Sequence, residues 1–411
     1  AQLNERDFQT GRMKTGTPPR IDGRSIDYNA LTIQPGDQEI TGFSYSNTQK
    51  PDKQLPCHIG YTNPKVHEIL KQGFDRSPLF NGSIRGQGPR YCPSIEDKID
   101  RFAGRNRHQL FIEPEGWNTI EIYLNGFSSS LPIEVQHKAL QAIEGFENAK
   151  MFRPGYAIEY DYFPPTQIKN TLETKAVHGL YFAGQVNGTT GYEEAACQGL
   201  VAGANAALKV QDKEPFVLQR SDAYIGVLID DLINKGTDEP YRMFTSRAEY
   251  RILLRQDNAD TRLTSIGYKY GLVSEEQRQR ASDKLLNINK LNSFFNAFSV
   301  EPSLVNNHLE ENGYSPLKQK IKLNKFLKRP EINLSLCKLL LPPVASFIKN
   351  FSRDVCHTAE VELKYSGYIE KEQEQVEKMK RLENVSLERI EDFSSFSAIS
   401  SEARSKLDRK S

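Results

Sequence analysis

The sequence is poor in cysteine, and its cysteines do not form close pairs along the chain. The 411 residues include five cysteines, none of them in the CxxC spacing. An odd number without that spacing argues against a disulfide framework and against a structural zinc site. We therefore expect a reducing compartment and no bound metal.

Long hydrophobic runs are also missing. No apolar stretch approaches the length that crosses a bilayer, and residues 1–16 contain neither an initiating methionine nor a signal-peptide core. The sequence predicts a soluble protein that is not bound to a membrane, with a first residue that results from a cut.

The chain lacks an excess of charge of either sign. Its 54 basic and 53 acidic side chains give a net charge of +1, so any basic surface for a nucleic acid must be local. The length predicts two or three domains, each with a core of its own.

The character of the sequence changes near residues 211–222. Before them, short β-rich runs such as 117–126 alternate with glycine and proline, which predicts α/β structure. After them, helical spacing prevails in segments rich in Glu, Lys, Arg and Leu. The predicted domains are residues 1–21 together with 86–215, an inserted α/β segment 22–85, and a mostly helical domain 216–411.

The most informative stretch is residues 179–207, GLYFAGQVNGTTGYEEAACQGLVAGANAA. We expect an apolar strand at 180–183, then a glycine-rich loop, then a helix with many small residues. Free amide groups and the helix dipole at such a helix start favour an anionic or electron-rich ligand edge. A close-packed βα unit without a ligand would show the same glycine spacing, so the spacing alone leaves both readings open.

A second stretch, residues 88–102, reads GPRYCPSIEDKIDRF. Cys92 stands close to Arg90 and just before a predicted helix, for which Ser94 is the candidate N-cap. A cationic neighbour and a helix start both lower the pKa of a thiol, which makes Cys92 a candidate nucleophile. The alternative is an inert, buried cysteine.

Three further sets of residues are weaker candidates. Lys14, Arg20 and Arg24 lie among glycine and proline turns and suit anion binding. Cys57 stands beside His58, but neighbours on a strand point to opposite faces. A spacing of four residues would place three guanidinium groups on one helix face as a phosphate-binding stripe, although surface ion pairs explain it equally well; these are Arg247, Arg251 and Arg255.

The two long strings together resemble the signatures of the MnmG (GidA) family. The resemblance implies a Rossmann-like FAD-binding α/β domain of the glutathione-reductase type, present in part, with an inserted α/β subdomain and an all-α C-terminal domain. It implies that the first string contacts the isoalloxazine side of FAD through Gly184, Gln185, Asn187, Gly188 and Thr189. It implies contacts from the second string to a nicotinamide cofactor, with Cys92 as the catalytic residue; this string comprises Gly88, Pro89, Arg90, Tyr91, Cys92, Pro93, Ser94, Ile95, Glu96, Asp97, Lys98, Ile99, Asp100, Arg101 and Phe102.

The family resemblance also implies a reaction. Such an enzyme works with the GTPase MnmE, as a heterotetramer built on a homodimer, and modifies C5 of the tRNA wobble uridine. NADH reduces FAD, and methylenetetrahydrofolate supplies a one-carbon unit. Members occur in the bacterial cytoplasm and in mitochondria. The arginines implied to contact tRNA are Arg242, Arg247, Arg251 and Arg255.

The sequence departs from the family pattern at both ends. The G-x-G-x-x-G fingerprint that admits the FAD pyrophosphate is missing, so we expect this chain to encode only part of the FAD site. Two alternatives remain: a folate- and FAD-dependent tRNA uridine methyltransferase, which lacks the long helical extension, and a non-catalytic tRNA- or partner-binding fragment.

Overall fold

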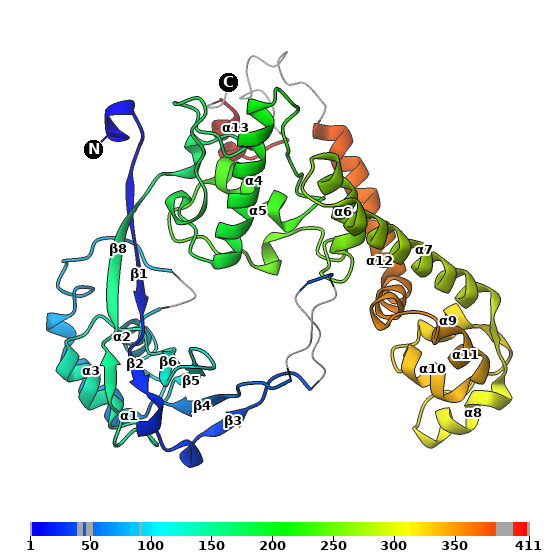
Figure 1. Ribbon diagram of the computed structural model, residues 1–411, viewed down its shortest axis with the longest axis horizontal. Coiled ribbons are helices and arrows are strands. Elements are labelled where there is room, and N and C mark those ends of the chain that lie inside the picture. The colour runs from blue at the N-terminus through cyan, green and yellow to red at the C-terminus, as the bar shows by residue number, and fades with distance from the viewer. Residues whose placement is uncertain (1, 39–43, 47–51, 90–92, 384–397, 409–411) are drawn as a thin grey trace. The chain divides into compact units, whose positions relative to one another are not determined.

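The structure is a computed structural model that describes residues 2–38, 44–46, 52–89, 93–383 and 398–408 (Figure 1). Its first compact unit comprises Ala1–Glu249 and Arg262–Arg278, and its second comprises Tyr250–Thr261 and Gln279–Ser411. The first unit mixes sheets and helices, and the second is almost entirely helical. The predicted order of an α/β part followed by a helical part is confirmed.

A six-stranded antiparallel sheet lies in the first unit, with strand order β3-β4-β5-β6-β2-β7. Side chains alternate across it, so that Ile122 and Leu124 of β6 are buried while their neighbours are more exposed. The strands are β3 (Thr32–Gln34), β4 (Cys57–Tyr61), β5 (Gln109–Pro114), β6 (Glu121–Asn125), β2 (Arg20–Asp22) and β7 (Met151–Arg153).

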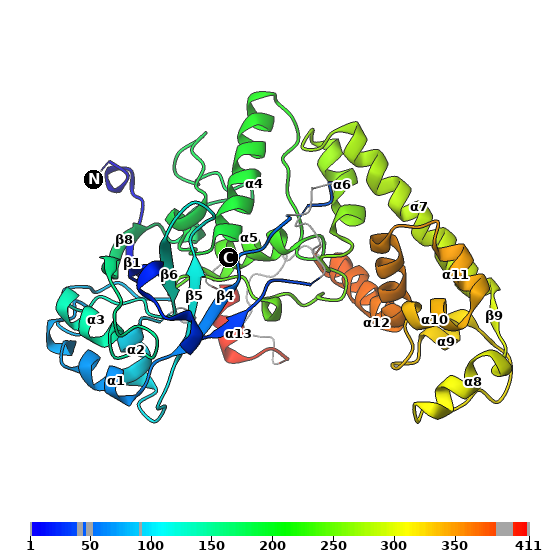
Figure 2. The same cartoon turned by 60° about the horizontal axis from the view of Figure 1, so that its bottom comes forward.

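Three short helices form one hydrophobic core with this sheet: α1 (Pro64–Lys71), α2 (Ile95–Arg101) and α3 (Ile133–Leu140). Figure 2 shows them gathered beside the strands. Val66, Ile95 and Ala139 each contribute a buried side chain from one of the helices. The apolar face of each helix therefore explains its place against the sheet.

A two-stranded ribbon of β1 (Gly11–Thr17) and β8 (Tyr156–Tyr162) is separate from this sheet. The two strands run antiparallel and side by side, from the pair Gly11 and Tyr162 to the pair Thr17 and Tyr156 (Figure 1). Met13 of β1 is completely buried.

The remaining helices of the first unit include α4 (Tyr192–Val210) and α5 (Tyr224–Lys235), and the division between the units falls within α6 (Ala259–Lys269) and α7 (Glu275–Ala297). The strand expected at 180–183 does not form, because its backbone makes only local pairs: Tyr181 forms a single bridge with Glu173, and Phe182 donates to the carbonyl of Leu172. Short 3-10 helices lie at Asn4–Arg6, Gly23–Ser25, Tyr28–Ala30, Phe74–Arg76, Pro165–Gln167, Gly184–Asn187 (η6) and Thr245–Arg247 (η7).

The second unit has a core of its own, which includes Ile288, Phe295 and Phe326. Among the described residues, no helix is both long and apolar enough to span a membrane. The elements of this unit are β9 (Ser299–Val300), α8 (Pro302–Glu311), β10 (Ile321–Lys322), α9 (Leu323–Leu327), α10 (Leu334–Leu340), α11 (Pro342–Ile348), α12 (Arg353–Glu383) and α13 (Ser401–Asp408).

Two buried histidines beside the six-stranded sheet make the stability of the first unit dependent on pH. The rings of His67 and His108 lie 5.3 Å apart, and Nε2 of His67 is 2.7 Å from the hydroxyl of Thr62. Burial lowers the pKa of both histidines. The unfolded chain therefore binds more protons below pH about 6.5, so stability is lost as the pH falls through that value.

We expect a lower melting temperature at pH 5.5 than at pH 7.5, and a smaller difference in the variant His108→Phe. This pH range lies above the window in which carboxylates with lowered pKa values titrate, such as Glu173 with a pKa of about 2. An unchanged pH dependence in His108→Phe would assign the loss to other groups.

Candidate functional site

The glycine loop before α4 has the backbone that the sequence predicts. Gly184 and Gly188 both adopt left-handed conformations, with φ of 82° and 76°. A Cβ atom at Gly188 would also lie 2.7 Å from the side chain of Thr237, so both conformation and space require glycine. Helix α4 follows after Gly191, which provides no side-chain cap, and the side chains of Glu194 and Arg242 lie close to this glycine.

One buried side chain that the sequence analysis missed, Gln198 of α4, organises this loop. Its Oε1 accepts hydrogen bonds from the amide of Gly184 (3.1 Å) and from Nδ2 of Asn187 (2.8 Å). Its Nε2 donates to Oγ1 of Thr189 (3.0 Å). Three of the five predicted flavin residues are thus fixed by one amide group. By contrast, Gln185 is exposed.

The loop also meets a structural test for a bound flavin. Oδ1 of Asn187 is buried and has no hydrogen-bond partner among the described residues. A buried acceptor without a donor costs about 1–3 kcal/mol. The loop therefore combines a glycine backbone, a helix start without a side-chain cap and an acceptor that lacks a donor, and these residues fit a polar cofactor edge that carries a hydrogen-bond donor.

A segment from beyond the predicted domain boundary docks on this loop. The amide of Tyr241 donates to the carbonyl of Gly188 (2.8 Å), and the amide of Thr190 donates to the carbonyl of Tyr241 (3.3 Å). The amide of Met243 donates to Oε1 of the buried Glu194 in the first turn of α4 (2.7 Å). Residues 241–243 therefore pack against the glycine loop and the first turn of α4.

The helix expected to carry the arginine stripe is absent. Residues 248–258 form turns and bends, because local contacts compete with a helix there: the side chain of Arg255 pairs with Asp257 (2.9 Å), and Asn258 donates to the carbonyl of Leu253 (3.1 Å). Arg247 instead stacks on the ring of Tyr241, with 4.1 Å to its centroid. The four predicted arginines are divided between the two units, with Arg242 and Arg247 in the first, and Arg251 and Arg255 in the second.

A cluster of charged residues around the buried Asp231 holds the segment 241–243 in place. Asp231 of α5 is 1% exposed and accepts hydrogen bonds from the hydroxyl of Tyr241 (2.9 Å) and from Arg220 (2.8 Å). Arg220 also holds Glu249 through two bonds of 2.7 and 2.8 Å. Burial alone would raise the pKa of Asp231, but bonds from Lys235, Arg220 and Tyr241 lower it below its ordinary value. The carboxylate therefore stays charged and holds Tyr241 in place.

Met13 of β1 brings the two sequence motifs together. Its backbone pairs with Gln87, just before the second motif, while the amide of Lys14 donates to the carbonyl of Gln87 (3.0 Å). A Cβ atom at Gly188, in the first motif, would lie 3.3 Å from Cε of Met13. Stretches that are far apart in the sequence thus both approach Met13 within one unit, one at its backbone and the other at its side chain.

A pocket of about 220 Å³ opens at the second motif, beside Met13. The charged side chains of Lys14, Asp97, Arg101 and Glu239 line it together with four serines. Six of the residues predicted to contact nicotinamide line this pocket: Gly88, Pro89, Pro93, Ser94, Asp97 and Arg101.

The other described residues of the second motif do not line the pocket. Ile95, Glu96 and Ile99 are buried, and Nζ of Lys98 donates to the carbonyl of Gly126 (3.0 Å). Asp100 and Phe102 are exposed. Arg90, Tyr91 and Cys92 lie outside the described residues, so the role of Cys92 remains a prediction.

Of the three weaker candidates for anion binding, one lines the pocket and two form ion pairs elsewhere. Lys14 lines the pocket with its Nζ 3.3 Å from Oδ2 of Asp97, and Ser94 caps α2 as predicted. Arg24 instead pairs with Asp22 outside the pocket (2.7 Å), and Arg20 pairs with Glu115.

The pair Cys57 and His58 does not show the electrostatics of an activated thiol. Burial raises the pKa of the Cys57 thiol and lowers that of His58. An activated cysteine needs the opposite shift of its own pKa.

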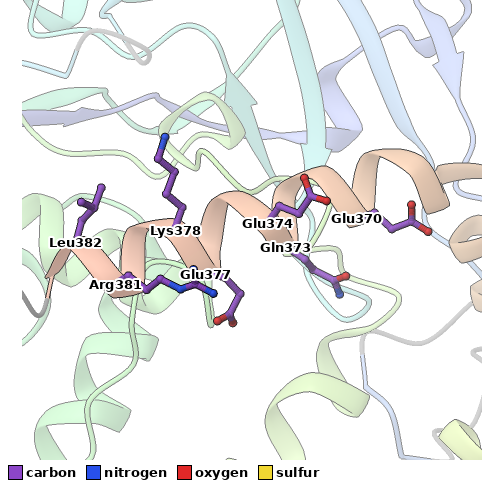
Figure 3. A pocket seen from close by; sticks show the side chains of 7 residues that line it. All are labelled: Glu370, Gln373, Glu374, Glu377, Lys378, Arg381 and Leu382. Carbon is purple, nitrogen blue, oxygen red and sulfur yellow. The ribbon is translucent and has the colours of Figure 1, made fainter.

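A hollow of about 870 Å³ lies along α12 in the second unit, where Figure 3 shows its lining. All of the lining residues belong to one face of this helix: Glu370, Gln373, Glu374, Glu377, Lys378, Arg381 and Leu382. One helix face cannot enclose a small ligand, so the pocket at the second motif is the better candidate among the described residues.

Comparisons with known proteins find relatives that match nearly the whole chain. A family model described as glucose inhibited division protein A matches residues 1–214, and one described as the C-terminal helical domain of the tRNA modifying enzyme MnmG/GidA matches residues 275–373. The tRNA uridine 5-carboxymethylaminomethyl modification enzyme MnmG of Christiangramia forsetii is 59% identical over 408 residues, which cover 98% of this chain and 65% of that protein. MnmG of Cytophaga hutchinsonii is 57% identical, with 99% and 66% covered. The chain thus spans about two thirds of the length of these relatives.

Solved structures show the same similarity. Aquifex aeolicus GidA in its form II crystal matches with a TM-score of 0.81 and 42% identity, over 98% of this chain and 64% of that one. The form I crystal gives 0.81 and 44%, over 98% and 65%. The α/β region followed by a helical region is consistent with an FAD-binding fold and a helical domain.

Proposed function

Because this chain belongs to the MnmG (GidA) family, we propose that it carries the flavin and nicotinamide portions of an enzyme that modifies C5 of the tRNA wobble uridine at position 34. The product carries a carboxymethylaminomethyl or aminomethyl group. The observation that supports this proposal most directly is the meeting of the two family motifs at Met13. A redox cofactor and its reductant must come close together, and Met13 contacts both the glycine loop and the residue that precedes the second motif.

The flavin portion is the loop that Gln198 holds. Gly184, Gln185, Asn187, Gly188 and Thr189 would bind the isoalloxazine side of FAD. The start of α4, which has no side-chain cap, would stabilise negative charge on the bound ring. Bound FAD supplies hydride chemistry, with NADH as the reductant and methylenetetrahydrofolate as the one-carbon donor.

The nicotinamide portion is the pocket at the second motif. Its mixed charges and serine hydroxyls offer both donors and acceptors to a nicotinamide nucleotide. Cys92 is the proposed catalytic thiol.

The remaining proposals concern domains and partners. We propose residues 1–21 with 86–215 as the FAD-binding part, 22–85 as an insertion, and 216–411 as the part that binds tRNA and MnmE in a homodimer-based heterotetramer. Arg242, Arg247, Arg251 and Arg255 remain the proposed tRNA contacts. Since the relatives named above are bacterial, we place the protein in the cytoplasm. The match of the helical domain at 275–373 disfavours the methyltransferase alternative.

Adding FAD to the purified chain tests the proposal. We expect the protein to retain a flavin absorption spectrum after desalting, because Gln198 holds the loop that is proposed to bind the isoalloxazine side. Gly188→Val should reduce the retained flavin, since its side chain would clash with Thr237 and strain the loop. The matched control Gly179→Val changes a left-handed glycine with nothing within 4 Å of its Cβ position. A colourless wild-type chain would support the alternative of a non-catalytic binding fragment.

A further inference from the structure

Glu96, in the first turn of α2, is a buried acid within the second motif. Its exposed fraction is 0%, whereas its neighbour Asp97 lines the pocket. An isolated acid in a core is costly, and an apolar side chain would fill this space at a lower cost in stability. Its contacts therefore call for a functional explanation.

The Glu96 carboxyl group does not line the pocket, but its hydrogen bonds hold one wall of the pocket in place. Its Oε1 accepts hydrogen bonds from the amide of Ser130 (2.7 Å) and from the hydroxyl of Ser130 (2.8 Å). The amide of Ile95 donates to the carbonyl of Ser128 (2.7 Å). Ser128, Ser129 and Ser130 form the serine wall of the pocket. Three hydrogen bonds thus fix the serine wall to the start of α2.

These contacts determine whether the Ser130 hydroxyl offers a hydrogen-bond donor or an acceptor to a ligand in the pocket. Its hydroxyl proton is donated to Glu96, and its Oγ lies 2.9 Å from Oγ of Ser77, which must then be the donor between the two. A hydroxyl oxygen has two acceptor lone pairs. One of them remains for a ligand, so Ser130 would recognise a hydrogen-bond donor such as an amide N–H or a ribose hydroxyl.

A charged Glu96 would add to a pocket whose lining charges already balance. The lining already contains two cations, Lys14 and Arg101, and two carboxylates, Asp97 and Glu239. Oε2 of Glu96 is buried and has no hydrogen-bond partner among the described residues. Burial raises the pKa of Glu96, although hydrogen bonds from Ser130, from Ser129 and from its own amide favour its charged form. Ionisation of Glu96 would therefore make the pocket more negative.

We propose that Glu96 is a positioning residue that fixes the serine wall so that Ser130 accepts a hydrogen bond from the donor groups of a nicotinamide nucleotide. The inference takes its ligand class from the proposed function and rests on it in that respect.

The test compares Glu96→Ala, Glu96→Gln and a matched control, Glu68→Ala, which removes an exposed acid from α1 of the same unit. NADH binding is followed by nucleotide fluorescence, and exchange of the Ser130 amide by hydrogen–deuterium exchange. Glu96→Ala should weaken NADH binding about tenfold or more and accelerate exchange at Ser130. Glu96→Gln should retain both, because its Oε1 accepts the same two hydrogen bonds. Glu68→Ala should match the wild type.

The dependence on pH separates positioning from simple packing. NADH affinity of the wild type should fall as the pH rises through the raised pKa of Glu96, and Glu96→Gln should remove that fall. Equal NADH affinity in Glu96→Ala and the wild type would overturn the proposal. If the wild type does not bind NADH, the proposed nicotinamide function fails. The hydrogen-exchange experiment then tests the positioning role of Glu96 alone. Equal exchange at the Ser130 amide in the wild type and in Glu96→Ala would overturn that role.

Discussion

Replacing Asp231 by alanine should lower the free energy of unfolding by about 2–4 kcal/mol, since the buried hydroxyl of Tyr241 and one N–H group of Arg220 lose their acceptor. Asp231 is 1% exposed, and the substitution removes the acceptor for Arg220 and for the hydroxyl of Tyr241. Urea unfolding measures the loss. Asp231→Asn should cost less, because its amide oxygen still accepts the bond from Tyr241.

A neighbouring acid provides the control. The side chain of Asp230 is 38% exposed and also bonds Arg220 (2.8 Å), so Asp230→Ala should cost no more than about 1 kcal/mol. If Asp230→Ala and Asp231→Ala lower the free energy of unfolding equally, the burial of Asp231 does not determine its contribution to stability.

The loss of Asp231 should reach the glycine loop through Tyr241. The Tyr241 backbone bonds both Gly188 and Thr190, and its side chain is anchored by Asp231. Hydrogen exchange of the Tyr241 amide should therefore accelerate in Asp231→Ala, well before global unfolding. An unchanged rate would mean that the two backbone bonds hold the segment without the side-chain anchor.

The features that the sequence predicted are mainly local. Gly184 and Gly188 were predictable because a left-handed backbone favours glycine whatever surrounds it. Ser94 was predictable as the cap of α2 because an N-cap acts within three residues along the chain. The order of an α/β part and a helical part followed from periodicity over long segments.

The features that the sequence missed depend on contacts between distant segments. The role of Gln198 depends on the loop returning over α4, and a lone glutamine among small helix residues gives only a weak signal of it. The arginine spacing suggested a helix, but pairing of Arg255 with Asp257 and of Arg247 with Tyr241 uses those side chains elsewhere. A strand at 180–183 failed for the same reason, since a strand is defined by a neighbour that periodicity cannot identify.

Gln198→Leu should have the second large effect, on both stability and flavin binding. It keeps a similar volume but leaves the Gly184 amide and Nδ2 of Asn187 without the acceptor that they share. Each unsatisfied buried group costs about 1–3 kcal/mol, so we expect a loss of about 2–4 kcal/mol in the free energy of unfolding. Retained FAD should fall with it, since the loop then loses its fixed shape.

The control for this prediction is Gln185→Leu, a change of the same type at an exposed position of the same loop. It should leave the free energy of unfolding within about 0.5 kcal/mol of the wild type, as surface changes usually do. If Gln185 contacts FAD as proposed, it should still reduce retained flavin. Loss of stability without loss of flavin in Gln198→Leu would separate the loop from cofactor binding, whereas loss of flavin in both variants would place the cofactor against the loop that Gln198 supports.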